Sequence, residues 1–329
     1  MMVSPQSASF MDRCVSGVIR VCVCMVVCFA GSTLQAAEPP VTTIMFAPGG
    51  ESVVVGSQAG VTAYNWPDLK RQKVLDTSLV TIHDLAFSPN GRMLAAGGGT
   101  PSEEGLTELL AWPGGESLGV LSGHEDTVLA VAWENDAVLA TASLDHEIAQ
   151  WEVKSRKQVQ RLKGHSSGVT ALSFLSEGQH VISGGRDNNL RVWDTASGRM
   201  IRTLNNHTRE IHQLAVRPRV SGLPMVASVS NDKTVRLWQP TIGRMVRFTR
   251  LTSIPLAVAW LPDGSQIAVS CEDGAVRLID PDTVEIRRKF PAVDGWAYSL
   301  AVHPTDGSLL VGGRNGQLSR IVHAARPAE

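Results

Sequence analysis

The stretch GHSSGVTALSFLSEGQHVISGGRDNNLRVWD, residues 164–194, decides the fold of this chain. It opens with Gly164 and His165 and closes with Trp193 and Asp194. Three apolar runs of strand length lie between these dipeptides, separated by glycines and polar residues. The runs are rich in β-branched and aromatic residues and end in turn-forming residues, as short β-strands do. Three such strands cannot bury their faces by themselves, so we expect the unit to recur.

The unit recurs along the whole chain after residue 40. The third apolar run of each unit ends at Trp66, Trp112, Trp151, Trp193, Trp238, Ile279 and Ile321. The first run ends at Phe46, Phe87, Trp133, Phe174, Val216, Trp260 and Val302. Both sets have spacings of 39 to 46 residues, and turns such as FSPNG and WLPDG follow the first run. Two independent markers therefore predict seven units, and no unit carries a sustained helical period.

Bulk composition excludes several function classes. The formal net charge of the 329 residues is -1, so no global field favours nucleic acid or an anionic membrane. Four of the five cysteines lie in the first 30 residues, and Cys271 alone remains beyond them. The repeat region therefore cannot form an internal disulfide. No Cys-x-x-Cys-His stretch is present, which argues against covalent haem attachment.

The Gly-His opening, the Trp-Asp closing and the four short strands per unit resemble the WD-repeat (WD40) family of β-propellers. The resemblance runs from residue 41 to about residue 323. It implies an all-β, seven-bladed propeller of four-stranded antiparallel blades, occupying residues 37–329. Only Trp193 and Asp194 spell the closing dipeptide in full. With the export signal described below, the chain is identified as an exported, bacterial-type member.

The resemblance also implies a buried hydrogen-bonded network in three blades. In the family, a His, a Ser or Thr, an Asp and a Trp form this network within one blade. The matching sets are His124, Thr141, Asp145 and Trp151; His165, Ser183, Asp187 and Trp193; and His207, Ser228, Asp232 and Trp238. A buried carboxylate needs donors, and imidazole, hydroxyl and indole groups can supply a connected chain. The threefold recurrence with a Trp argues against a hydrolase triad.

The N-terminus predicts an export signal. Arg13 and Arg20 precede an apolar run, 21–30, and a polar stretch ends in small residues at Ala36. This order is typical of a secretory signal peptide over residues 1–36, with cleavage after Ala36. An uncleaved anchor is the alternative, but the apolar run is shorter than the roughly 20 residues of a membrane span. We therefore expect no membrane span in the mature chain.

The last unit poses a problem of closure. Family propellers commonly complete the last blade with a strand from the other terminus. The repeat register places that strand near residues 30–35, inside the expected signal peptide. We expect a last blade of three strands, formed near 298–302, 308–312 and 317–323.

The channel-facing surface is the expected partner site, because WD-repeat propellers mostly bind other proteins at their narrower face. The register points these residues there: His83, Leu129, Thr170, Arg186, His212, Leu256, Trp296 and Tyr298. Aromatic, Arg and aliphatic side chains are enriched in binding hot spots. Trp296 could equally fill the seam between the last and first blades. His83 and His212 are three blades apart without a dense cluster of acidic residues, so no metal site is expected.

The leading functional hypothesis is a non-enzymatic protein-interaction scaffold, exported to the periplasm or cell envelope. The expected partners are proteins, including envelope or c-type cytochrome proteins by resemblance, with no nucleic acid and no cofactor, and we expect a monomer. The basic outer strands fit the protection of sheet edges better than nucleic-acid binding, since they carry few aromatics for base stacking. The alternative is an exported propeller enzyme or small-ligand binder that uses the central channel.

Overall fold

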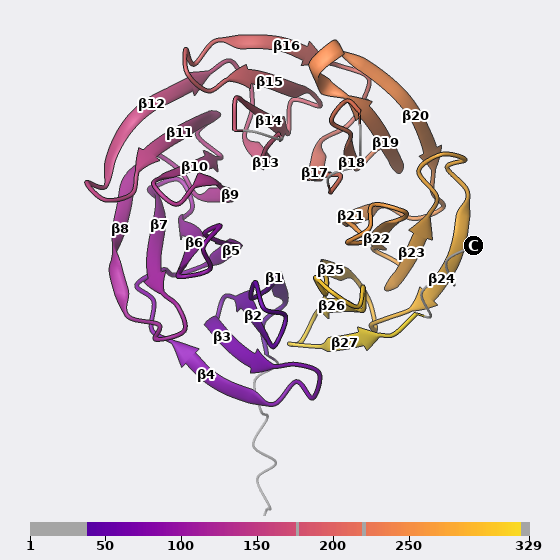
Figure 1. Cartoon of the computed structure of the whole chain (residues 1–329), viewed down its shortest axis with the longest axis horizontal. Helices are drawn as coiled ribbons and strands as arrows, with labels where there is room; N and C mark the ends of the chain where they lie inside the picture. The colour runs from indigo at the N-terminus through magenta and orange to yellow at the C-terminus, as the bar shows by residue number, and fades with distance from the viewer. Residues whose placement is uncertain (1–37, 176–177, 219–221, 324–329) are drawn as a thin grey trace, which may run out of the picture. The chain divides into compact units, whose positions relative to one another are not determined.

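The computed structural model describes residues 38–175, 178–218 and 222–323. The expected signal peptide, its cleavage site and the possible closing strand near residues 30–35 lie outside these residues. Within them the chain forms seven antiparallel sheets arranged as a ring, each a blade of a β-propeller (Figure 1). Six sheets have four strands and the last has three. The predicted seven-bladed all-β fold is thus confirmed, including its three-stranded last blade.

The strands form four concentric layers around the central channel (Figure 1). The innermost strands are β1 (Val41–Phe46), β5 (Ile82–Phe87), β9 (Val128–Asn135), β13 (Val169–Phe174), β17 (Ile211–Val216), β21 (Pro255–Trp260) and β25 (Ala297–Val302). The second layer is β2 (Ser52–Ser57), β6 (Met93–Thr100), β10 (Val138–Ser143), β14 (His180–Gly185), β18 (Val226–Ser230), β22 (Ile267–Cys271) and β26 (Leu309–Gly313).

The third layer is β3 (Gly60–Asn65), β7 (Glu104–Ala111), β11 (Glu147–Glu152), β15 (Leu190–Asp194), β19 (Thr234–Gln239), β23 (Ala275–Ile279) and β27 (Leu318–Ile321). The outer layer is β4 (Arg71–Leu75), β8 (Ser117–His124), β12 (Lys157–Lys163), β16 (Met200–Leu204), β20 (Arg244–Arg250) and β24 (Ile286–Pro291). A short 3-10 helix, η1 (Pro240–Ile242), precedes β20.

The core lies between the blades. Most second and third strands are buried on both faces, as in β22 and β23, where all five residues of each are buried. This explains why these strands read as continuous apolar runs instead of alternating ones. Seven hydrophobic clusters fill the seven interfaces between neighbouring blades. Each blade therefore depends on its neighbours, which is why one unit could not fold alone.

One marker from the sequence was wrong in detail. Trp193 lies next to the end of its third strand and pairs with Val181, but the corresponding positions in the first two blades are Tyr64 and Leu110. Trp66 and Trp112 lie two residues further on, after the strands have ended. Each precedes a proline, which favours leaving the ladder. Their rings instead pack edge-on against first-strand phenylalanines, with centroids 4.9 and 5.1 Å apart.

Candidate functional site

The mouth of the central channel is built from seven β-bulges. In every first strand the pairing with the second strand skips one residue near its start. The skipped residues are Thr42, His83, Leu129, Thr170, His212, Leu256 and Tyr298. A bulge leaves its extra residue unpaired and re-aims the side chain. All seven line one cavity of about 520 Å³ in the channel.

The sequence therefore brings six of its predicted partner-binding residues together in this cavity. They are His83, Leu129, Thr170, His212, Leu256 and Tyr298. Burial lowers the pKa of both histidines below the ordinary range, so the two rings are neutral near pH 7. The Nε2 atom of His212 is buried without a hydrogen-bond partner among the described residues. The cavity is thus a mixed surface of neutral polar and apolar groups.

Two polar side chains of the channel wall were missed by the sequence analysis. The Asp84 carboxylate accepts hydrogen bonds from the backbone N–H groups of Leu85 and Val131, each 2.9 Å away. Burial raises the pKa of Asp84 to about 7, although these hydrogen bonds oppose the shift. Gln213 accepts from the N–H of Val258 at 2.7 Å. Both side chains connect one inner strand to the next, which is a structural role that short-range spacing does not reveal.

Trp296 and Tyr298 form an aromatic pair beside the cavity. Their ring centroids lie 5.7 Å apart, and the Trp296 side chain is 47% exposed. Tyr298 lines the cavity, whereas Trp296 lies outside it, immediately before β25. An interpretation of Trp296 as a seam filler leaves this exposed half unexplained. A large exposed aromatic next to a concave surface has the composition of a binding hot spot.

Arg186 does not reach the cavity. Its Nε atom lies 4.0 Å from Oε2 of Glu210, on the next blade. Asn231 donates to the other Glu210 oxygen at 2.7 Å. Arg186 therefore belongs to an exposed polar cluster across two blades, and its charge is partly balanced there.

The three predicted networks are all hydrogen-bonded in the structure. In the fourth blade Trp193 donates its indole N–H to Ser183 Oγ at 2.9 Å. Nε2 of His165 lies 2.8 Å from the same oxygen, and its Nδ1 lies 3.0 Å from Asp187 Oδ1. A neutral imidazole that accepts from the hydroxyl and donates to the carboxylate satisfies the contacts with Ser183 and Asp187. The result is one directed chain from indole to carboxylate.

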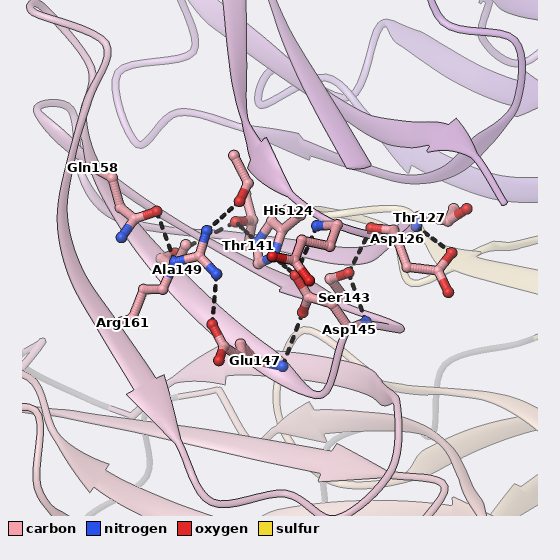
Figure 2. A network of polar contacts seen from close by, with 12 residues as sticks. His124, Asp126, Thr127, Thr141, Ser143, Asp145, Glu147, Ala149, Gln158 and Arg161 are labelled. Carbon is pink, nitrogen blue, oxygen red and sulfur yellow. Dashed lines mark hydrogen bonds and ion pairs between the residues drawn. The ribbon is translucent and has the colours of Figure 1, made fainter. Parts of the chain in front are cut away.

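The third and fifth blades repeat this geometry. In the third, His124 contacts both Thr141 and Asp145 (Figure 2). The nitrogen–oxygen distances are 2.8 Å to Thr141 and 2.7 Å to Asp145. Trp151 donates to Thr141 at 2.8 Å. In the fifth blade the corresponding bonds join His207 to Ser228 at 2.7 Å, His207 to Asp232 at 2.9 Å and Trp238 to Ser228 at 2.8 Å. Three buried copies with the same donor order indicate a structural element of the blade.

An arginine four residues after the turn aspartate completes several networks and was missed. Arg191 donates to Asp187 at 2.6 Å, Arg236 to Asp232 at 3.5 Å, and Arg277 to Asp273 at 2.6 Å. The last pair gives the sixth blade an ion pair although it lacks the histidine. The Asp-x-x-x-Arg spacing was visible in the sequence and could have found these residues.

The second blade replaces the network with a different acid. Glu108 on β7 is buried, and one of its oxygens accepts from Thr77 Oγ1 and from the N–H of Ser78, both at 2.8 Å. The other accepts from Ser117 at 2.6 Å. Burial alone would raise the pKa of Glu108, but these three donors and the Ser78 hydroxyl, 3.1 Å away, outweigh burial and lower the pKa. No spacing rule taken from the regular blades predicts this substitution.

Electrostatics hold the networks in one protonation state. Burial alone would raise the pKa of Asp187 and Asp232, but the bonded histidines and their other donors hold both well below the usual range. Burial lowers the pKa of His165 and His207, and their aspartates oppose that shift only in part. Neutral histidine beside ionised aspartate is therefore the resting state.

The rest of the described chain adds no chemical centre. Over these residues no group of three or more His, Cys, Asp or Glu side chains is placed to hold a metal ion. No helix in the same part of the chain has the length and apolarity to cross a bilayer. Burial raises the pKa of the free Cys271 thiol to about 11, which keeps it protonated and unreactive.

Comparison with known proteins matches five segments to one family model, "WD domain, G-beta repeat": residues 70–100, 115–152, 156–194, 198–239 and 251–280. Telomerase protein component 1 of Rattus norvegicus is 29% identical over 248 residues, 71% of this chain and 9% of the relative. WD repeat-containing protein slp1 of Schizosaccharomyces pombe is 28% identical over 187 residues, which is 56% of this chain and 37% of the relative. Protein FIZZY-RELATED 1 of Arabidopsis thaliana is 26% identical over 210 residues, which is 63% of this chain and 44% of the relative.

This chain spans less than half the length of each of these three relatives. The matched segments of the family model cover more than half of this chain and fall on the blades described above. Proteins of this family are non-enzymatic interaction scaffolds, in agreement with the expected absence of enzymatic activity. The chain therefore belongs to the WD40 repeat family.

Proposed function

We propose that this protein is an exported interaction scaffold that binds a protein partner across the mouth of its channel. The observation that carries this proposal is the Trp296–Tyr298 pair at the rim of the cavity. The exposed indole offers a large apolar surface at low cost in side-chain entropy. The bulged residues around it give the partner a concave, mixed surface with few charges to desolvate.

Binding through this pair is testable by a matched set of variants. A Trp296→Ala/Tyr298→Ala double variant should weaken partner recovery by tenfold or more in a cross-linking pull-down from the compartment where the protein resides. Phe248→Ala is the control, because Phe248 is an aromatic of similar exposure, 49%, on the outer strand β20. Equal recovery by both variants and the wild type would refute this face as the binding site.

The export proposal rests on the charged, apolar and small-residue order of residues 1–36. We propose that the mature protein resides in the periplasm or cell envelope. We also propose that it is a bacterial-type member of the family and a monomer. Mass spectrometry of the protein recovered from its compartment should give a mature N-terminus at Ala37. Recovery of the uncleaved chain from the cytoplasm would contradict export.

Envelope proteins are the proposed partners, with c-type cytochromes as the specific class. The support is the export signal together with the resemblance to exported WD-repeat proteins, some of which occur with c-type cytochrome modules. Mass spectrometry of the cross-linked complex identifies the partner, and haem absorbance in the co-purified fraction tests the cytochrome class. A partner without haem would refute that class and leave the scaffold proposal standing.

The channel supports a second candidate, a small-ligand binder. Its cavity of about 520 Å³ lies in the size range of ligand pockets. Native mass spectrometry of the purified protein should then show a bound molecule that Tyr298→Ala loses and Phe248→Ala keeps. A mass equal to that of the bare chain under gentle conditions would count against this candidate.

A further inference from the structure

We propose a second interaction surface, the outer edge of β27, which accepts one extended strand from a partner protein. Within the described residues β27 is the last strand of its sheet, whereas every other third strand is covered by a fourth (Figure 1). The backbone groups along such an edge are a template for strand addition. The inference rests on the proposed removal of residues 1–36 and is independent of the channel-mouth face.

The side chains of β27 show what this edge is shaped to receive. Leu318 pairs with Gly312 as Leu190 pairs with Gly184 in the fourth blade, so the two leucines are equivalent. Leu190 is fully buried, with 0% exposure, whereas Leu318 remains partly exposed. An apolar side chain in the third layer is thus left without the cover that its counterpart has.

The other blades specify the missing neighbour. Leu190 is paired across the sheet with Leu204, Val61 with Leu75, and Ile148 with Leu162. All three outer leucines are buried, although most of the residues around them on the outer strands are exposed. A strand added to β27 therefore needs an apolar residue, best a leucine, opposite Leu318, with polar residues around it.

A cavity of about 350 Å³ lies against this edge. Residues 291–294, which lead out of β24, form one wall, and residues 317–319 form the other. The side chain of Leu318 packs in the cluster between the last and first blades, so the apolar residue of the added strand would join that cluster. Its neighbours in the added strand point to the opposite face, where the cavity lies. The cluster and the cavity supply the side-chain specificity, and the β27 backbone supplies the affinity.

The ring is closed by side-chain contacts and by one backbone bond, from the Gly316 N–H to the Pro39 oxygen at 3.1 Å, and none of these bonds uses the backbone of β27. Ser299 donates to the backbone oxygen of Val41 at 3.0 Å, and Nε2 of His303 lies 3.1 Å from the Gly50 oxygen. The His303 ring stacks on the Trp66 ring with centroids 5.4 Å apart. The Arg320 guanidinium also lies over the Trp66 ring, 4.8 Å from its centroid. A hydrophobic cluster fills the same interface.

The partner segment is therefore an extended stretch of about five residues that runs antiparallel to β27. It carries an apolar residue at its C-terminal end, preceded by hydroxyl or cationic residues, and no proline. The chain itself contains one competitor, since Leu34 precedes Val41 by seven residues, as Leu204 precedes Ile211. The proposed cleavage after Ala36 removes that competitor from the mature protein.

A peptide that copies an outer strand of this protein serves as the probe. The chain from residue 37 is suitable for the test because all seven core clusters lie between residues 41 and 321. A fluorescent peptide with the sequence of residues 199–205, RMIRTLN, should bind this chain saturably at one site. The Leu204→Asp version of the peptide should bind at least tenfold more weakly. Fluorescence anisotropy measures both.

Variants and hydrogen exchange locate the binding. Leu318→Asp in the protein should weaken binding at least tenfold, whereas Ile286→Asp on the outer strand β24 should not change it. If Leu318→Asp does not fold, hydrogen exchange on the unaltered chain decides, because bound peptide should protect the amides of residues 318–321. Absence of binding, or protection confined to other strands, would overturn the proposal.

Two other occupants are distinguishable in the same experiment. If the protein recovered from its compartment retains residues 30–35 and refuses the peptide, the edge belongs to its own N-terminal segment and the proposal is wrong. A dimer that the peptide dissociates would assign the edge to a second copy of this chain, and this result would also contradict the proposal. The Trp296→Ala/Tyr298→Ala variant separates the two proposals. If this variant binds the peptide and also recovers the partner as well as the wild type does, the channel-mouth function is refuted and the β27 proposal stands.

Discussion

The fourth and seventh blades are built on the same register but are stabilised differently. In the fourth blade a buried chain of indole, hydroxyl, imidazole and carboxylate connects two strands, a loop and a turn. In the seventh, Asn315 stands where Asp187 stands and Ile321 where Trp193 stands, and aromatic contacts across the seam take over. A regular blade has an internal network in addition to the packing against its neighbours, whereas the last blade depends on contacts with its neighbours. Both surfaces that we propose for binding lie on this last blade.

The largest effect expected from this comparison is on the buried carboxylate. Asp187→Ala should lower the free energy of unfolding by about 3–5 kcal/mol, because it leaves Arg191 and His165 buried without their partner. The equivalent Asn315 is exposed and has a positive φ of 58°, so Asn315→Gly should change stability by no more than about 0.5 kcal/mol. Chemical denaturation measures both. Equal costs would show that the two blades do not differ as described.

The equivalent leucines of the third layer sharpen the comparison. Leu190→Ala should cost about 3 kcal/mol, because the leucine is fully buried between Leu204 and the core. Leu318→Ala should cost about 1 kcal/mol, because part of this side chain already meets solvent. Denaturation of the two variants beside the wild type tests the ratio. A cost of Leu318→Ala as large as that of Leu190→Ala would mean that the edge is covered in solution.

The regular blades were predictable from sequence because their signals are local. Period, turn chemistry and the short spacings among Ser183, Asp187 and Trp193 lie within one unit, so they predicted the repeat architecture and carried the family resemblance that implied the three networks. The positions of the channel-mouth residues followed from the same register. One-dimensional spacing was sufficient wherever a group interacts within its own blade.

Interactions between blades were not predictable in this way. Asp84 and Gln213 bond to the backbone of the next inner strand, 47 and 45 residues along the chain. Glu108 collects donors from two different segments, and no repeated pattern marks it. The strand ends predicted at Trp66 and Trp112 were wrong because the sequence alone does not distinguish a tryptophan that pairs in a strand from one that follows its end. The missing information is the side-chain geometry between blades.

The buried histidines make stability depend on pH, with a smaller effect. Folding lowers the pKa of His165 and His207 below their ordinary value of 6.5, so the unfolded chain binds more protons as the pH falls. Their contribution to stability is complete above pH 6.5 and declines below it, by up to about 1.4 kcal/mol per pH unit for each histidine. Denaturation at a series of pH values measures this slope. The lowered pKa values of Asp187 and Asp232 act in the same direction at more acidic pH. A stability that rises on acidification from pH 6.5 would contradict the neutral assignment.

The smallest effect is expected at the residue to which we assign binding. Trp296→Ala should change the free energy of unfolding by no more than about 0.5 kcal/mol, because nearly half of this side chain is exposed and its ring contact is with Tyr298. The same variant should weaken partner binding, so stability and function separate at one position. Thermal and chemical denaturation supply the first measurement and the pull-down the second. A loss of 2 kcal/mol or more would instead make Trp296 a seam filler, and the case for the channel mouth would then depend on Tyr298 and the bulged residues alone.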